Sequence, residues 1–126
     1  MRLLLAFLVT LLVAACGPRV ANFQDTALPS GKHIKVIGVD TISFSKGPPA
    51  LMLKYQTDIS MDDKGALQKE VDEIWASFRH DVEHAGMSAA IISATEKPSG
   101  VILTTSRGNN FVYKKGADGS WQQSGQ

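Results

Sequence analysis

Two histidines stand four residues apart in the second half of the chain, and a glutamate lies between them. Residues 80–84 read HDVEH. Residues four apart on a helix share one face, so His80 and His84 could bind one metal ion together. Glu83 could then act as a base on a metal-bound water, and Glu73, seven residues before His80, could be a further ligand. These side chains are the candidate metal site of the sequence.

The same five residues resemble the H-x-x-E-H motif of the inverted zinc proteases. That resemblance implies a third, acidic ligand well downstream, in a protein much larger than this chain of 126 residues. The only acids after His84 are Glu96 and Asp118, both in predicted turns. Helical spacing also points His80 and His84 away from the apolar stripe, whereas a catalytic metal needs a dry, shaped cleft. We therefore expect no catalytic residues and no cofactor, and keep His80 and His84 only as candidate metal ligands.

The single cysteine of the chain, Cys16, is a second reactive side chain and directly follows an apolar leader. Arg2 supplies a positive start, residues 3–15 are apolar apart from one threonine, and two alanines precede Cys16. This length is typical of a secretory signal peptide. It is short for a membrane-spanning helix, which needs about 20 apolar residues.

The end of this leader, Val13-Ala14-Ala15-Cys16, resembles the lipobox of bacterial lipoproteins. The resemblance implies that Cys16 receives a diacylglycerol, that residues 1–15 are removed, and that the new N-terminal amine takes another acyl chain such as palmitate. Two or more chains anchor a protein stably in a bilayer. In enteric lipoproteins an aspartate after the cysteine signals inner-membrane retention. Gly17 stands here instead, which implies the outer membrane, on its periplasmic side. A plain secretory protein and an N-terminal membrane anchor are the alternatives.

Composition limits what the rest of the chain can be. Residues 16–126 suffice for one modest domain. Lys and Arg number 13 against 12 Asp and Glu, a formal net charge of +1. No basic excess therefore supports a nucleic-acid partner. If Cys16 carries lipid, no cysteine is left for a disulfide or for a nucleophile, so the core must hold the fold.

Residues 16–31 are predicted to be a lipidated N-terminus followed by a flexible tether. Prolines and glycines punctuate this segment, and its apolar residues show no clear period. The alternative is that Val20, Phe23 and Leu28 pack back onto the domain.

Residues 32–126 are predicted to form one small α+β domain. β-Branched and alternating stretches predict strands. These cover residues 33–44, 50–59, 88–94, 101–106 and 111–115, and Trp121 marks a further strand that is the least clearly indicated. An apolar stripe predicts one long amphipathic helix over residues 63–85, ended by Gly86. The order ββαβββ predicts an antiparallel sheet of about five strands with the helix packed on one face.

The other face of that sheet is the candidate binding surface. Along the strand at residues 50–59, Met52, Lys54 and Gln56 alternate with apolar residues and should share the uncovered face. Trp121 is a further candidate if it stands exposed at the sheet edge, and the alternative is that it covers the core there.

The sequence carries no phosphate loop, dinucleotide fingerprint or nucleophile elbow. We therefore expect a non-enzymatic interaction or accessory module of the cell envelope. Its partners would be the bilayer, through acylated Cys16, and an envelope protein. The alternative is an envelope lipoprotein that binds a small ligand or a metal.

Overall fold

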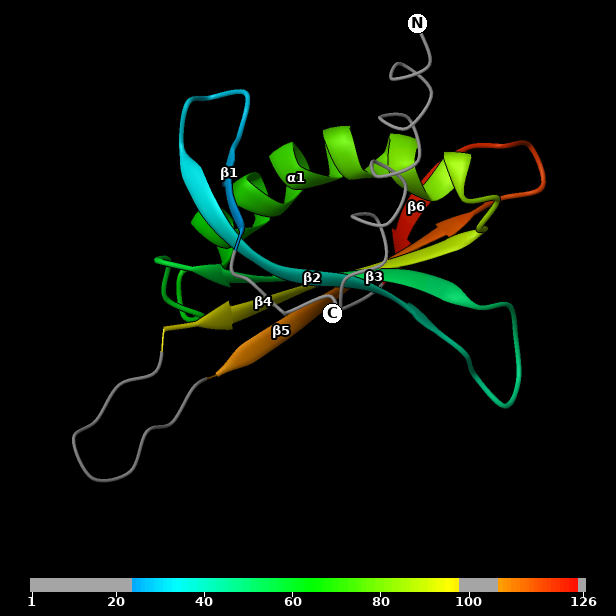
Figure 1. The fold of residues 1–126 in the computed structure, drawn as a ribbon. Coiled ribbons are helices and arrows are strands. Elements are labelled where there is room, and N and C mark those ends of the chain that lie inside the picture. The colour runs from blue at the N-terminus through cyan, green and yellow to red at the C-terminus, as the bar shows by residue number, and fades with distance from the viewer. Residues whose placement is uncertain (1–23, 98–106, 125–126) are drawn as a thin grey trace, which may run out of the picture.

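The computed structural model describes residues 24–97 and 107–124, which form one sheet and one helix (Figure 1). The elements in chain order are β1 (Gln24–Ala27), β2 (His33–Ile42), β3 (Ala50–Thr57), α1 (Lys64–His84), β4 (Ala89–Glu96), β5 (Gly108–Lys115) and β6 (Trp121–Ser124). The leader, Cys16 and the strand predicted at residues 101–106 lie outside the described residues.

The six strands lie side by side in the order of the chain. Every neighbouring pair is antiparallel except β3 and β4, which run parallel. A parallel pair needs a long crossover, and the 21-residue α1 provides it. The predicted α+β class with a single long helix is therefore confirmed. The sheet, however, is only mostly antiparallel, and it has six strands in the described residues.

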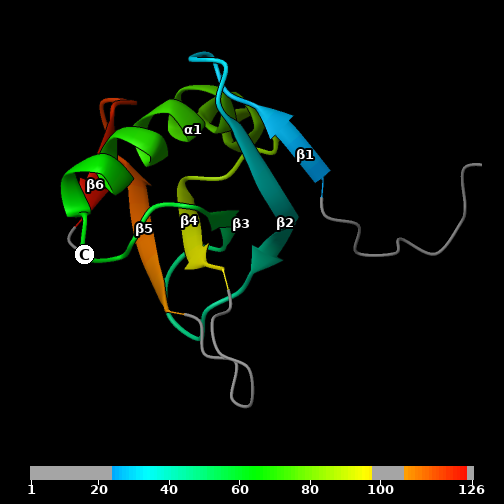
Figure 2. The same ribbon diagram turned by 90° about the vertical axis from the view of Figure 1, so that its left-hand side faces the viewer.

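α1 forms where the apolar stripe predicted it, within one residue at each end. Asp63 caps its start by accepting a hydrogen bond from the Ala66 backbone N–H at 3.2 Å. Gly86, with φ of +73°, follows its end. α1 crosses one face of the sheet (Figure 2). Its buried residues belong to the main core together with strand residues such as Tyr55, Ile92 and Phe111. This helix is not apolar enough along its length to span a membrane.

β1 lies in the segment that was predicted to be a flexible tether. It pairs with β2 from Gln24↔Val36 to Ala27↔His33, and Leu28 is 7 % exposed and belongs to the core. The tether prediction is thus wrong for residues 24–28, and the packing alternative is confirmed for Leu28. Val20 and Phe23 lie outside the described residues. Backbone pairing needs no apolar alternation, so the polar sequence QDTA gave no strand signal.

The strand predicted at residues 111–115 begins three residues earlier than predicted, at Gly108. Gly108, Asn109 and Asn110 belong to β5 and pair with β4 residues. A Cβ at Gly108 would lie 3.1 Å from the carbonyl oxygen of Ala94, so glycine at this position lets β5 approach β4 closely. The least clearly indicated strand is present as β6, which pairs Trp121 with Lys115.

Candidate functional site

The sheet face opposite α1 carries an apolar row across its centre. The register aligns Met52 of β3 with Ile91 of β4 and Val112 of β5. These three residues pack in a small cluster of their own, separate from the core beneath α1. Ile91 is buried, while Met52 and Val112 are half-buried. In Figures 1 and 2 no helix of the described chain covers this side of the sheet, which we call the open face.

Basic residues flank the apolar row on the open face. Lys54 aligns with Gly38 and Ser93, and Lys114 lies two residues beyond Val112 on the same side of β5. Lys54 and Lys114 are exposed, and neither takes part in an ion pair within residues 24–97 and 107–124. The open face therefore combines apolar surface with two lysines that form no ion pair with any described carboxylate.

The structure brings the three predicted β3 residues together but not Trp121. Met52, Lys54 and Gln56 follow one another along the open face. Trp121 lies on the α1 side, where its indole N–H donates a hydrogen bond of 2.9 Å to Glu83. Its ring also meets the Trp75 ring edge-on at 5.1 Å. Trp121 thus covers the edge of the core, on the opposite side of the sheet from Met52, Lys54 and Gln56.

His80 and His84 are exposed on α1, as the helical spacing predicted. The other members of the candidate metal site are engaged elsewhere. The hydrogen bond from Trp121 lowers the pKa of Glu83, and nearby Lys115 acts in the same direction. Glu73 accepts a hydrogen bond from the Ser30 backbone N–H at 3.2 Å. Across the described part of the chain, no group of three or more His, Cys, Asp or Glu residues is placed to hold a metal ion.

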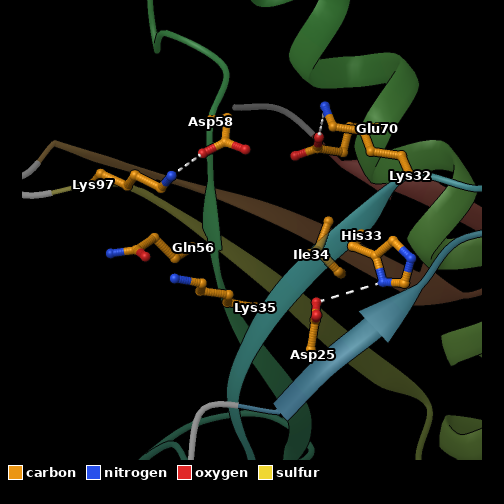
Figure 3. A pocket seen from close by; sticks show the side chains of 9 residues that line it. All are labelled: Asp25, Lys32, His33, Ile34, Lys35, Gln56, Asp58, Glu70 and Lys97. Atoms are coloured by element: carbon orange, nitrogen blue, oxygen red, sulfur yellow. Dashed lines mark ion pairs between the residues drawn. The ribbon is translucent and has the colours of Figure 1, made fainter.

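A polar cavity of about 240 Å³ lies where the β1–β2 hairpin meets β3 and α1 (Figure 3). Three ion pairs cross or line it: Lys97–Asp58 at 2.6 Å, His33–Asp25 at 3.6 Å and Lys32–Glu70. Each carboxylate of the wall therefore has a basic neighbour, so the cavity offers little net charge to a ligand. Its most unusual member is Glu70.

Glu70 is a carboxylate that is only 4 % exposed, beneath the cavity. It accepts a hydrogen bond of 2.6 Å from the Thr57 hydroxyl, and Lys32 supplies its counter-charge. Burial, together with the negative charge of Glu70, raises the pKa of the neighbouring Tyr55, so that phenol stays protonated. Sequence reasoning missed Glu70. The available signal was its position one turn before Ile74, inside the apolar stripe of α1.

Arg107 is engaged within the domain, at the start of β5. Its guanidinium donates to both carboxylate oxygens of Asp62 at 3.1 Å and, through Nε, to Glu96 at 2.8 Å. The hydrogen bonds that Arg107 donates to Asp62 are the main cause that lowers the pKa of Asp62. The group therefore ties the loop before α1 to the β4–β5 end of the sheet.

Comparison with known protein families, with curated proteins and with solved structures finds no match for this chain.

Proposed function

We propose that this chain is a bacterial envelope lipoprotein whose domain binds another envelope protein and performs no catalysis. The observation that carries the proposal is the open face, where the row of Met52, Ile91 and Val112 is flanked by Lys54 and Lys114. An apolar centre with a polar rim is the usual arrangement of a protein–protein interface.

The open face also indicates what kind of partner surface would fit. The row needs an apolar patch opposite it, and the unpaired Lys54 and Lys114 need carboxylates around that patch. Asp40, aligned with Met52, is an acid of the same face and would disfavour a partner with acids at that point. We therefore propose a partner that presents aliphatic side chains edged by Asp or Glu.

Lipidation at Cys16 would hold the domain close to a membrane. β1 begins at Gln24, so seven residues, 17–23, and hence eight Cα–Cα steps, separate the acylated cysteine from the sheet. Even fully extended, they reach no more than about 28 Å. A partner would therefore have to stand in the same membrane or approach its surface. With Gly17 after the cysteine, we propose the periplasmic side of the outer membrane.

The anchor is tested by substituting Cys16→Ser in the full chain and labelling cells with an alkyne-bearing palmitate. We expect labelling to be lost and the leader to be retained, which raises the apparent mass. Gly17→Ala is the matched control and should be labelled and processed normally. Unchanged labelling of the Cys16→Ser chain would contradict the proposal.

A second candidate function, small-ligand binding, is favoured by one observation. An apolar groove of about 460 Å³ lies at one end of the open face. A small molecule that fills this groove should raise the melting temperature of the purified protein by mass action, with no protein partner present. Metal binding at His80 and His84 stays a prediction that no described cluster supports.

A further inference from the structure

The groove at the end of the open face is a hollow with an aliphatic floor. Ala50 and Ala89 form part of it and are 1 % and 7 % exposed. Ile91 and Val112 line it from the neighbouring row, while Phe44, from the loop after β2, stands at the rim with 48 % of its surface exposed. Small side chains between larger ones leave the depression, and its volume of about 460 Å³ is that of a ligand pocket.

The mouth of the groove is positively charged. Lys46, Lys114 and Lys115 line it, and no Asp or Glu is among its lining residues in the described chain. Lys115 lies 5.9 Å from the centre of the Trp121 ring. Lys46 and Lys114 form no ion pair with any residue that the structure describes. Two ammonium groups are thus left free to bind an anion above an apolar floor.

We propose that this groove binds a single-chain anionic amphiphile, an alkyl chain that ends in a carboxylate. The chain would lie against Ala50, Ala89 and Ile91, and the carboxylate would lie between Lys46 and Lys114. An alkyl chain has no polar groups to satisfy, which suits a floor of aliphatic side chains. A carboxylate accepts charge-assisted hydrogen bonds from lysine. The groove shares Ile91, Val112 and Lys114 with the open face but does not include Met52, Lys54 or Gln56. This inference therefore names the ligand class of the second candidate function, and it does not require that a protein binds at Met52 and Lys54.

The test uses the full chain held in nanodiscs of a zwitterionic phosphatidylcholine. The probe is a photoreactive dodecanoate, and mass spectrometry maps the labelled residues. We expect labelling to concentrate on peptides that contain Phe44, Ile91 or Val112. Reversing both charges, with Lys46→Glu and Lys114→Glu, should reduce labelling about tenfold, because two charge-assisted contacts are lost. Lys69→Glu, on an exposed position of α1, is the control and should leave labelling unchanged.

Two further comparisons separate the head group from the chain. Dodecanol should compete with the probe at least about fivefold less well than dodecanoate, because it lacks the charge that pairs with lysine. Ala89→Leu should block labelling by filling the groove, and circular dichroism checks that this variant keeps its fold. Three results would overturn the inference: labelling spread evenly over the chain, equal competition by dodecanol, or full labelling of a folded Ala89→Leu chain. None of them bears on whether a protein binds at Lys54.

Discussion

Glu70 is a buried carboxylate that joins three parts of the fold. It lies on α1, accepts a hydrogen bond from Thr57 at the end of β3, and pairs with Lys32 in the β1–β2 turn. A buried carboxylate without partners costs several kcal/mol, so these two contacts are what make its position tolerable. Glu70 therefore fixes the short hairpin of β1 and β2 against the helix.

We predict that Lys32→Met destabilises the domain by about 1–3 kcal/mol, because it leaves the Glu70 carboxylate buried without its counter-charge. Because the Lys32 side chain is 40 % exposed, solvent screens its charge, and we expect a loss of stability in the lower part of this range. Lys69→Met, at an exposed position of α1, should change stability by less than about 0.5 kcal/mol. Urea unfolding measures both. Equal effects of the two substitutions would contradict the role of Glu70.

The pairing of Arg107 with Asp62 makes the stability of the domain depend on pH. The folded-state pKa of Asp62 lies below its ordinary value of 3.8 because Arg107 hydrogen-bonds the charged form. The resulting stabilisation is present above about pH 4 and is lost as the pH falls through the lowered pKa. Arg107→Gln should therefore destabilise the domain more at pH 6 than at pH 3, and raise the Asp62 pKa in an NMR titration. A loss that is the same at both pH values would contradict the pairing.

At the scale of elements, the sequence predicted those whose side chains carry a period. The apolar stripe marked α1 to within one residue at each end, and alternation along β3 placed Met52, Lys54 and Gln56 on one face. β1 was missed because its residues are polar and only pairing with β2 makes it a strand. The start of β5 was missed because Gly108 and two asparagines are typical turn residues.

The candidate sites divide in the same way. The open face could be predicted because one strand shows it by alternation alone. The groove could not, because its floor joins Ala50, Ala89 and Ile91 from two strands that α1 separates along the chain. Which residues meet across β3 and β4 depends on a register that no local pattern fixes.

The ends of α1 provide a test at the scale of this element. Gly86 follows the helix with φ of +73°, where a side chain is strained, so Gly86→Ala should destabilise the domain by about 1 kcal/mol. Gly65 lies in the first turn of α1, where a Cβ would meet no atom within 4 Å. Gly65→Ala should therefore stabilise by about 0.5 kcal/mol. Thermal unfolding measures both effects. If both substitutions raised the melting temperature, or both lowered it, the assigned end of α1 before Gly86 would be contradicted.

At the scale of the whole molecule, the two sides of the sheet are unequal, because the one helix of residues 24–97 and 107–124 lies on one side of their six strands. The α1 side holds the main core, with Tyr55 and Phe111 at 0 % and 1 % exposed. The open face holds a second, smaller cluster with lysines around it. The proposed lipid anchor at Cys16 would keep the domain near a membrane, where the proposed partner must approach.

The most direct test of this account places a photoreactive amino acid at position 54 or 56 of the full chain, in its own cell. We predict that both positions capture the same envelope protein and that Met52→Asp abolishes the capture. Position 69, on α1, should capture nothing. Capture from position 69 to the same extent, or no capture from positions 54 and 56 in a folded, palmitate-labelled chain, would contradict the claim that the open face binds a partner.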